Sequence, residues 1–369
     1  MDAFSTWLEI DLNAIRNNIR RMSSITSRPV MAIIKANAYG HGLEIVGQTA
    51  ESCGAAWLGV ARLNEALALR LAGIDIPILV LGFTSPEFVT EALLHRISLA
   101  VYDPEIAAGY ADQARAAGQV LSVHAKFDSG MGRLGVFTED GLEFVRHIHS
   151  LPELRLEGAF THMASADDPE LKTTRWQIER FSGLIDALEQ NNLRPPLVHA
   201  ANSAASLYFP DARFDMVRSG IAIYGLHPAA EAPLPEGFQP ALTWKAQLVS
   251  IKTLPPGHGI GYNYRYTTKN TERIGVVPAG YADGFRRRLG NFVLVGGRRV
   301  PVVGGVCMDQ CMVLLDDVPS ARVGDEVVLL GSQNESVITA EEIGQAWGTV
   351  NYDVVCGLAA RVPRLYNNR

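Results

Sequence analysis

The sequence lacks any apolar run that approaches the roughly 18 residues a membrane-spanning helix needs. It also lacks a strong charge bias, because the formal net charge is only −6 over 369 residues. That balance gives no reason to expect nucleic acid or an anionic membrane as a partner. The N-terminal segment has acidic residues where a secretory signal would be basic and then apolar: MDAFSTWLEIDLNAIRNN. These absences favour a cytoplasmic protein.

Cysteine is scarce, and the few cysteines are scattered. Cys53, Cys307, Cys311 and Cys356 are too widely spaced for a disulfide framework in a chain of this length. Cys307 and Cys311 have no second pair of Cys or His nearby that would complete a metal site. We therefore expect reduced, mostly buried thiols and no bound metal.

What the sequence does contain, from Pro29 onward, is a regular alternation of two patterns. Short apolar runs rich in β-branched residues alternate with longer segments whose apolar residues recur at i, i+3 and i+4. The expected strands are VMAIIKA, AWLGVA, PILVLGF, ISLAVYD, QVLSVHAKFD, RLEGAFTHMA, PLVHAANSA and FDMVRSGIAIYG. Such alternation indicates a parallel sheet covered by helices. Eight strands in this pattern predict a (β/α)8 barrel of the TIM type rather than an open doubly wound sheet.

The pattern changes after the barrel segments. A connection rich in Pro, Ala and Glu, LHPAAEAPLPEGFQPALTW, precedes short strands separated by Gly, Pro and Asp turns. One helical patch, TAEEIGQAWG, interrupts them. We expect a barrel domain over residues 1–235 and a C-terminal, mostly-β domain over residues 236–369, with the first ten or so residues able to pair with the second domain.

Polar residues gather where the expected barrel strands end. In a barrel of this type the active site lies at the C-terminal ends of the strands. Each polar residue alone has a structural explanation, such as a solvated strand end or a helix cap. Together they converge on one rim: Lys35, then Lys126 with Asp128 and Arg133, His162, Asn202 with Ser203, and Arg218.

Lys35 suggests the chemistry of that rim. It follows an apolar strand, although lysine is among the residues least often buried. In a partly desolvated barrel mouth near Arg218, its pKa should fall, so that it acts as a free amine. A free amine beside anion-binding groups fits a Schiff base with pyridoxal phosphate. The hydroxyl of Ser203 and the backbone N–H groups of Gly220 and Ile221 would supply uncharged phosphate donors. The residues alone therefore predict a barrel that binds a phosphorylated carbonyl compound, but they do not identify a substrate.

A family resemblance goes further. The motifs AIIKANAYGHG, HAKFDSGMGRLG, GAFTHMASAD, HAANSAA, DMVRSGIAIYG, IGYNYRY, VPAGYADGFRR, GGVCMDQCMV and GLAARVPR occur in this order. Together they resemble alanine racemase, a pyridoxal-phosphate enzyme family of fold type III, over nearly the whole chain. Racemases of lysine, serine and broader specificity share much of this pattern.

The resemblance implies two bases. Lys35 would bind pyridoxal phosphate and act on one face of the substrate Cα. Tyr262 would act on the opposite face, supplied by the other subunit of a head-to-tail homodimer. Two bases on opposite faces suit racemisation of alanine, because one removes the Cα proton and the other returns one. Tyr264 and Tyr266 lie close by in the same motif and remain alternatives for the second base.

The resemblance also implies the remaining site residues. Arg218 would face the pyridine nitrogen, with His162 in a hydrogen-bond chain towards Tyr262. Arg133 would bind the substrate carboxylate, helped by the backbone N–H of Met308 from the partner subunit. Lys126 matches a lysine that is often carbamylated in the family, and Tyr281 matches a residue that narrows the substrate entrance. The remaining residues would contact the cofactor: Tyr39, Asn202, Ser203, Gly220, Ile221 and Tyr352. Ala359 departs from the family, which often has a polar residue there.

Two other functions remain open at this level. A fold-type III decarboxylase of basic amino acids pairs a similar barrel with a β domain, but Arg218 stands where its acidic residue would be. A non-catalytic pyridoxal-phosphate carrier needs only the barrel, whereas this chain has the long β-rich segment and IGYNYRY. The sequence does not decide whether the enzyme supplies D-alanine for peptidoglycan or degrades it.

Overall fold

The structure is a computed structural model that describes residues 4–167 and 172–368. The chain divides into two compact units. The barrel unit comprises Ala14–Ala38 and Gly42–Gln239, and the β unit comprises Met1–Asn13, Tyr39–His41 and Pro240–Arg369. Within the described ranges, every helix is too short or too polar to span a lipid bilayer.

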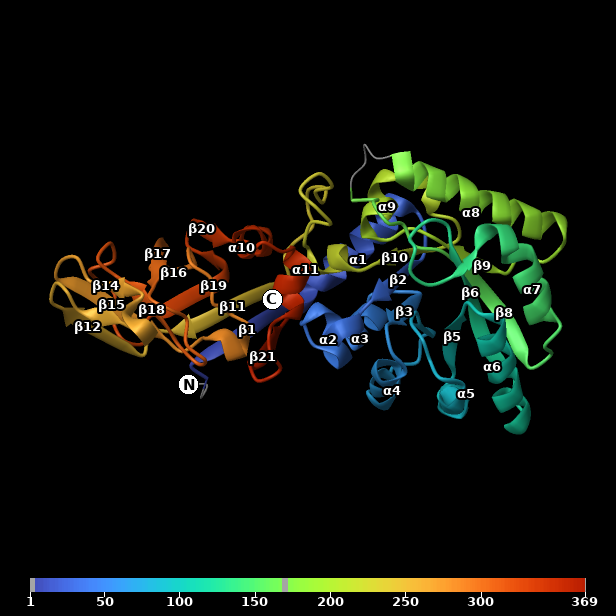
Figure 1. Ribbon diagram of the computed structural model, residues 1–369, viewed down its shortest axis with the longest axis horizontal. Coiled ribbons are helices and arrows are strands. Elements are labelled where there is room, and N and C mark those ends of the chain that lie inside the picture. The colour runs from blue at the N-terminus through green and yellow to red at the C-terminus, as the bar shows by residue number, and fades with distance from the viewer. Residues whose placement is uncertain (1–3, 168–171, 369) are drawn as a thin grey trace. The chain divides into compact units, whose positions relative to one another are not determined.

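The barrel unit contains a parallel sheet in the order β10-β2-β3-β4-β5-β6-β8-β9, with β7 paired to the end of β6 (Figure 1). The strands are β2 (Val30–Ile33), β3 (Trp57–Val60), β4 (Ile78–Val80), β5 (Ile97–Val101), β6 (Leu121–Asp128), β7 (Val136–Phe137), β8 (Leu154–Phe160), β9 (Leu197–His199) and β10 (Val217–Ser219). The two ends of this path meet where the Arg218 N–H donates to the Ala201 carbonyl over 2.9 Å. All the expected strands are therefore confirmed, and with them the (β/α)8 fold.

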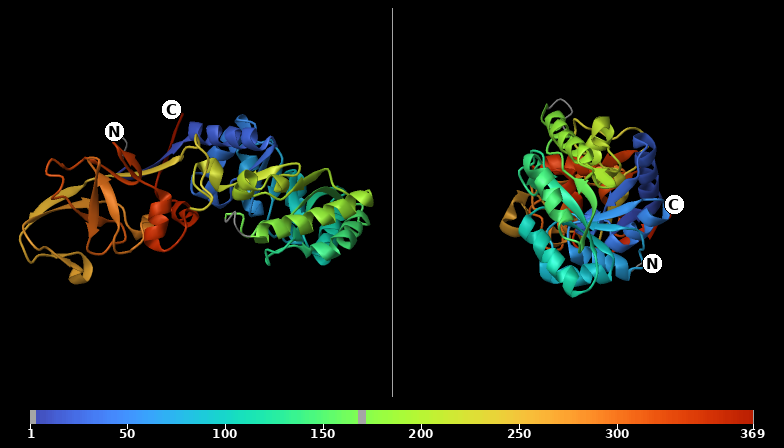
Figure 2. Two further views of the ribbon diagram at one scale, coloured as in Figure 1. Left: turned by 90° about the horizontal axis from the view of Figure 1, so that it is seen from above. Right: turned by 90° about the vertical axis from the view of Figure 1, so that its right-hand side faces the viewer.

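Helices cover the outside of these strands, as Figure 2 shows. They are α1 (Leu12–Thr26), α3 (Leu43–Ser52), α4 (Leu63–Leu71), α5 (Val89–Leu94), α6 (Pro104–Ala116), α7 (Gly141–His149), α8 (Lys172–Gln190) and α9 (Ser203–Tyr208). Strands β2 to β5 are buried at every position, as expected for parallel strands between a barrel core and a helical layer. Local signals fix the helix ends: Asp103 caps α6 by accepting the N–H groups of Glu105 and Ile106, and Pro104 occupies its first turn.

The expected strand ends are wrong by a few residues. β2 ends at Ile33 and β8 at Phe160, so Lys35 begins the short helical turn after β2 and His162 lies in the loop after β8. The chain leaves the sheet after β2 because it enters a left-handed turn that cannot continue a ladder. Arg218, in contrast, lies inside β10. The polar rim is therefore built by strand ends and by the segments that follow them.

The β unit contains a sheet in the order β12-β15-β18-β17-β16-β19-β11-β1-β21, with β20 paired to β19 and a separate hairpin of β13 and β14. Its strands are β1 (Thr6–Asp11), β11 (Leu242–Gln247), β12 (Ser250–Leu254), β13 (Gly259–Ile260), β14 (Tyr266–Thr267), β15 (Glu272–Val277), β16 (Phe292–Val295), β17 (Arg298–Val303), β18 (Cys311–Leu314), β19 (Glu326–Gln333), β20 (Ser336–Ile338) and β21 (Arg364–Asn367). Its helices include α10 (Ala340–Trp347) and α11 (Asn351–Cys356). The N-terminal strand β1 pairs antiparallel with β11 and parallel with β21.

The four cysteines all lie within the described residues and form no disulfide bond. Only Cys311 is buried, and Cys356 is exposed, so the expectation of mostly buried thiols is wrong. Cys356 lies at the end of α11, where the helix faces solvent. Among the described residues, no group of three or more His, Cys, Asp or Glu could hold a metal ion.

Candidate active site

Lys35 opens a short left-handed helical turn, α2 (Lys35–Tyr39). Ala36, Asn37, Ala38 and Tyr39 have φ values of 54°, 56°, 53° and 53°. Left-handed conformations cost an L-residue other than glycine roughly 1–2 kcal/mol. Consecutive strained residues persist only where the surroundings fix them, and such strain clusters at functional sites.

Glu65 of α4 helps to hold this turn, and sequence reasoning missed it. Its Oε1 accepts the Ala36 N–H over 2.6 Å, and its Oε2 accepts the N–H groups of Ala61 and Arg62 over 2.9 and 3.1 Å. A carboxylate that accepts three backbone donors holds the two loops in one geometry. Glu65 thereby orients the backbone that carries Lys35. A helical glutamate three residues into α4 resembles any capping residue, so this contact could not be predicted from the sequence.

Arg218 is only 3% exposed. Its Nη1 donates to His199, at Nδ1 over 3.0 Å and at the carbonyl over 2.8 Å. Its Nη2 donates to the carbonyls of Thr161 (2.6 Å) and Ala200 (2.9 Å) and to Nδ1 of His162 (3.2 Å). Both terminal nitrogens are thus committed. The Nε–H of Arg218 has no hydrogen-bond partner among residues 4–167 and 172–368, so this donor is left for a ligand.

The buried imidazoles beside Arg218 take a defined tautomer. Because a guanidinium only donates, Nδ1 of His162 and of His199 must accept, and each ring carries its proton on Nε2. The His199 Nε2–H then donates to Nδ1 of His124 over 3.0 Å. His124 in turn presents its Nε2–H towards Glu157 Oε2, 3.7 Å away. Burial, followed by the charge of Arg218, lowers the pKa of His162 and His199 well below the ordinary value, so these rings are neutral at pH 7.

Four cations meet at this end of the barrel, and their charges act on one another. Burial, followed by the positive charges of Arg133 and Arg218, lowers the pKa of Lys126 to about 8. The charge of Lys35 acts in the same direction. Burial and the charge of Arg133 lower the pKa of Arg218 to about 9. The one carboxylate that counteracts the effect on Lys126 is Asp128. The site therefore carries surplus positive charge and favours an anionic ligand.

Asp128 shapes the loop that presents Arg133. Its Oδ1 accepts the N–H groups of Gly130, Met131 and Gly132 over 2.8, 2.7 and 3.2 Å, and its Oδ2 accepts that of Arg133 over 3.1 Å. Burial raises the pKa of Asp128, but these four backbone donors outweigh burial and hold it below the ordinary value. The Arg133 side chain is left exposed. Asp128 is therefore a loop organiser, and Arg133 is available to a ligand.

A second polar group lies where β10 leaves the barrel. The Ser203 hydroxyl accepts the Gly220 N–H over 2.9 Å and the Ala222 N–H over 3.4 Å, and its own hydrogen can still be donated. Asn202 is the N-cap of α9: its Oδ1 accepts the Ala205 N–H over 2.9 Å. The cap gives the Asn202 side chain a structural role beside the predicted cofactor contact.

Tyr39 and Tyr352 meet within the β unit, with ring centroids 6.1 Å apart. Gly40 allows this approach, because a Cβ there would lie 2.1 Å from the Val355 carbonyl of α11. Arg364 donates from Nε to the Gly40 carbonyl over 3.1 Å and fixes the segment. Burial, followed by the nearby Tyr352, raises the pKa of Tyr39, so its hydroxyl stays protonated and acts as a donor.

The three tyrosines of IGYNYRY differ in their surroundings. Tyr266 donates its hydroxyl to Glu272 Oε2 over 2.7 Å, and burial and this contact raise its pKa to about 12. The Tyr264 ring covers Gly259, where a Cβ would lie 2.2 Å from it. Tyr262, between β13 and β14, is 68% exposed. Of the three, Tyr266 is thus committed to a carboxylate, and Tyr262 is presented on the surface of the β unit.

Tyr281 and Met308, also in the β unit, are brought together by their backbones. The Tyr281 N–H donates to the Cys307 carbonyl and the Ala282 N–H donates to the Met308 carbonyl, each over 3.0 Å. The side chains of Tyr281 and Met308 remain 45% and 53% exposed. We call these two residues the entrance pair. The structure thus joins two residues that the sequence placed in separate motifs.

Comparisons with known proteins agree with this geometry. Family models described as "Alanine racemase, N-terminal domain" and "Alanine racemase, C-terminal domain" match residues 10–228 and 241–366. The alanine racemase of Symbiobacterium thermophilum is 46% identical over 364 residues, covering 98% of this chain and 97% of the relative. That of Geobacillus kaustophilus is 44% identical over 99% of this chain and 96% of the relative.

Solved structures agree as well. Alanine racemase from Clostridium difficile 630 superimposes with a TM-score of 0.94 at 36% identity, covering 100% of this chain and 98% of that one. Alanine racemase from Bacillus anthracis with bound L-Ala-P has a TM-score of 0.94 at 39% identity, with coverage of 100% and 97%.

Proposed function

This chain belongs to the alanine racemase family of isomerases, and we propose that it interconverts L- and D-alanine with Lys35 and Tyr262 acting on opposite faces of the substrate. The observation that carries the proposal is the buried Arg218, whose terminal nitrogens are committed and whose Nε–H is left for a ligand amid surplus positive charge. An amine nucleophile, an anion site and a non-acidic donor are what this chemistry requires.

Pyridoxal phosphate, when bound, supplies an electron sink that makes the Cα–H of an attached amino acid acidic. The barrel residues fit this group, because they combine the Lys35 amine with surplus positive charge and an unused Arg218 donor. Lys35 would hold it covalently, and Arg218 would face its pyridine nitrogen. The remaining contacts would come from hydroxyl, amide and imidazole groups: Tyr39, His162, Asn202, Ser203, Gly220, Ile221 and Tyr352. The Gly220 N–H would be shared between the phosphate and the Ser203 hydroxyl that it already contacts.

Arg218 directs the outcome of the reaction. Its pKa of about 9 keeps it protonated at neutral pH, so it donates a hydrogen bond without transferring its proton. An acidic residue in its place would protonate the pyridine nitrogen and strengthen the electron sink. By donating a hydrogen bond and keeping its proton, Arg218 would hold the bound cofactor as a weaker electron sink, which would disfavour transamination. Racemisation is the reaction that this donor favours.

Two residues would move the Cα proton. Lys35 takes or returns it on one face, and Tyr262 does so on the other. The exposure of Tyr262 supports this role, whereas the hydroxyl of Tyr266 is engaged by Glu272. We infer that Tyr262 and the backbone N–H of Met308 act in a site of a second copy of the chain, in a head-to-tail homodimer. The proposed site of action is the cytoplasm.

Arg133 would bind the alanine carboxylate, and Tyr281 would narrow the entrance to favour a methyl side chain. We further propose that Lys126 is carbamylated, because a pKa of about 8 leaves a useful fraction of free amine near neutral pH. The amine nitrogen would add to the carbon of CO2 and release one proton to solvent. The resulting anion would replace a positive charge with a negative one beside Arg133 and so orient it.

The experiment that tests the two bases follows exchange of the Cα proton in D2O from each enantiomer separately. In Tyr262→Phe, exchange should persist from one enantiomer, because Lys35 still serves that face, while racemisation falls by at least about 100-fold. Tyr266→Phe is the matched control and should retain racemisation. Equal loss of exchange from both enantiomers, or full racemisation in Tyr262→Phe, would reassign the second base.

A further inference from the structure

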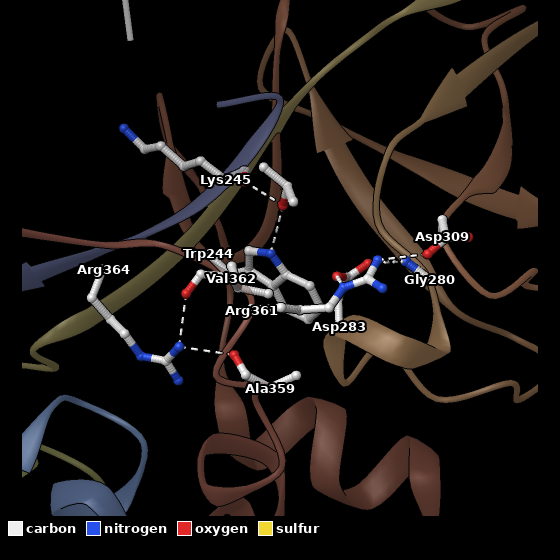
Figure 3. Close-up of polar contacts among 10 residues, drawn as sticks. Trp244, Lys245, Gly280, Asp283, Asp309, Ala359, Arg361, Val362 and Arg364 are labelled. Carbon is white, nitrogen blue, oxygen red and sulfur yellow. Dashed lines mark hydrogen bonds and ion pairs between the residues drawn. The ribbon is translucent and has the colours of Figure 1, made fainter. Parts of the chain in front are cut away.

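Arg361, in the motif GLAARVPR, makes two ion pairs within the β unit (Figure 3). Its Nε donates to Asp283 Oδ1 and its Nη2 donates to Asp309 Oδ1, each over 2.7 Å. Asp283 is almost fully buried, whereas Arg361 and Asp309 are about half exposed. None of the roles assigned above uses this arginine. A planar guanidinium with donors in a fixed fork can hold two carboxylates at a set separation.

The two carboxylates belong to the two segments that carry the entrance pair. Asp283 ends the short 3-10 turn that begins at Tyr281, and its Oδ2 accepts the Gly280 N–H over 2.8 Å. Asp309 directly follows Met308. Arg361 therefore ties the turn of Tyr281 to the segment of Met308 from outside, through side chains.

Backbone contacts draw the same segments together. A Cβ on Gly280 would lie 2.2 Å from the Met308 carbonyl, so only glycine permits this approach. The Ala359 N–H donates to the Asp283 carbonyl over 3.1 Å, which fastens the Arg361 segment to the same turn. This contact uses the backbone of residue 359, so the alanine found there leaves the attachment intact. The unit formed is a three-way junction of the 280–283 turn, the 307–309 segment and the 359–361 segment.

We propose that Arg361 is a positioning residue for substrate selection, which fixes the spacing of the entrance pair by bridging Asp283 and Asp309. The proposal rests on the proposed function, since it assumes that Tyr281 narrows the entrance and that Met308 contributes its N–H to carboxylate binding. In this role Arg361 would act through the carboxylates of Asp283 and Asp309. Without Arg361, the buried carboxylate of Asp283 and the carboxylate of Asp309 would have no cation to bridge them.

Loss of the bridge should weaken recognition of a small substrate more than proton transfer. In Arg361→Gln we expect KM for alanine to rise about tenfold, the scale of one charge-assisted hydrogen bond, with kcat within about twofold of the wild type. The preference in kcat/KM for alanine over serine should fall, because a looser entrance pair excludes the larger side chain less well. Arg361→Lys keeps the positive charge but loses the planar pair of donors. Its KM for alanine should therefore lie between those of the wild type and Arg361→Gln.

Two comparisons isolate the bridge from general damage. Arg299→Gln is the matched control, because Arg299 also pairs with a carboxylate of the β unit, that of Glu342 on α10, and should leave KM unchanged. Asp309→Asn removes the ion pair between Arg361 and Asp309 and leaves the ion pair with Asp283. If Arg361 acts through Asp309, the effect of Asp309→Asn in the wild type should be largely absent in the Arg361→Gln background. Full additivity of the two substitutions would overturn the bridging role.

Hydrogen exchange separates this inference from the proposed function. In Arg361→Gln, the peptide amides of Tyr281 and Ala282 should exchange faster, because their bonds to the 307–308 carbonyls lose lateral support. The measurement needs no substrate. Unchanged exchange, or unchanged KM and selectivity, would overturn the inference, whereas a wild-type protein without racemase activity would refute the proposed function.

Discussion

Replacing Asp128 with Asn removes the anion around which the Arg133 loop is built. Asparagine can keep its oxygen at the Oδ1 position, which accepts three N–H groups. Its amide nitrogen then occupies the Oδ2 position, where it cannot accept the Arg133 N–H because both groups are donors. An unsatisfied donor costs about 1–3 kcal/mol when it is buried, and the contact of the Arg133 N–H is only part-buried, while the loss of charge weakens the three remaining bonds. We therefore expect the loop to lose about 1–2 kcal/mol of local stability, first at Arg133.

This loss should appear mainly in substrate binding. Arg133 would hold the alanine carboxylate equally in the ground and transition states, so KM should rise by at least about tenfold with kcat less affected. Steady-state racemisation of L- and D-alanine measures both constants. Asp112→Asn is the control, since its carboxylate forms an exposed ion pair with Arg115, far from any proposed role. An unchanged KM in Asp128→Asn would refute the loop argument.

The same carboxylate predicts a dependence of stability on pH. The pKa of Asp128 is lowered in the folded protein, so its contribution is present above the unfolded value of 3.8. It is lost as the pH falls from there through the folded pKa. Urea unfolding of the wild type and of Asp128→Asn should therefore converge at acidic pH and diverge at neutral pH. Parallel stability curves across that range would contradict the assignment.

Three other substitutions or conditions test the barrel site. Gly158→Ala places a Cβ 2.3 Å from His124 Nδ1, so its free energy of unfolding in urea should fall by about 1–3 kcal/mol. Glu65→Gln can no longer accept both the Ala36 and the Ala61 N–H groups, so the turn that carries Lys35 should be held less firmly. The protein should therefore retain less cofactor after dialysis, as measured by absorbance. The initial rate at which Lys126 forms a carbamate with labelled CO2, followed by NMR at a fixed concentration of dissolved CO2, should rise about tenfold per pH unit below 8 and then level off, because only the free amine reacts. A flat pH dependence would contradict that account.

The sequence predicted the barrel well because its strands are short, apolar and regularly spaced. Parallel strands buried on both faces leave a periodic signal, and Gly or Asn often closes the helices between them. The polar rim followed from one topological rule, which brings strand ends together. The family resemblance then supplied roles that no single residue could indicate, such as that of Met308.

What the sequence could not predict depends on contacts between distant segments. Nothing local in KANAYG indicates four left-handed residues in succession, and one contact that holds the turn comes from Glu65 on another helix. The relay from Arg218 through His199 to His124 joins three strands and has no spacing in the chain. Gly280 and Gly40 read as ordinary turn residues, although each is needed where two backbones nearly touch.

The central claim is that Lys35 is the amine that holds the cofactor. Borohydride reduction of the holoenzyme, followed by proteolysis and mass spectrometry, tests it most directly. We expect a pyridoxyl label on Lys35 in the peptide AIIKANAYGHG, and no label in Lys35→Ala. A label on another lysine, such as Lys126 of the same site, would refute this role of Lys35.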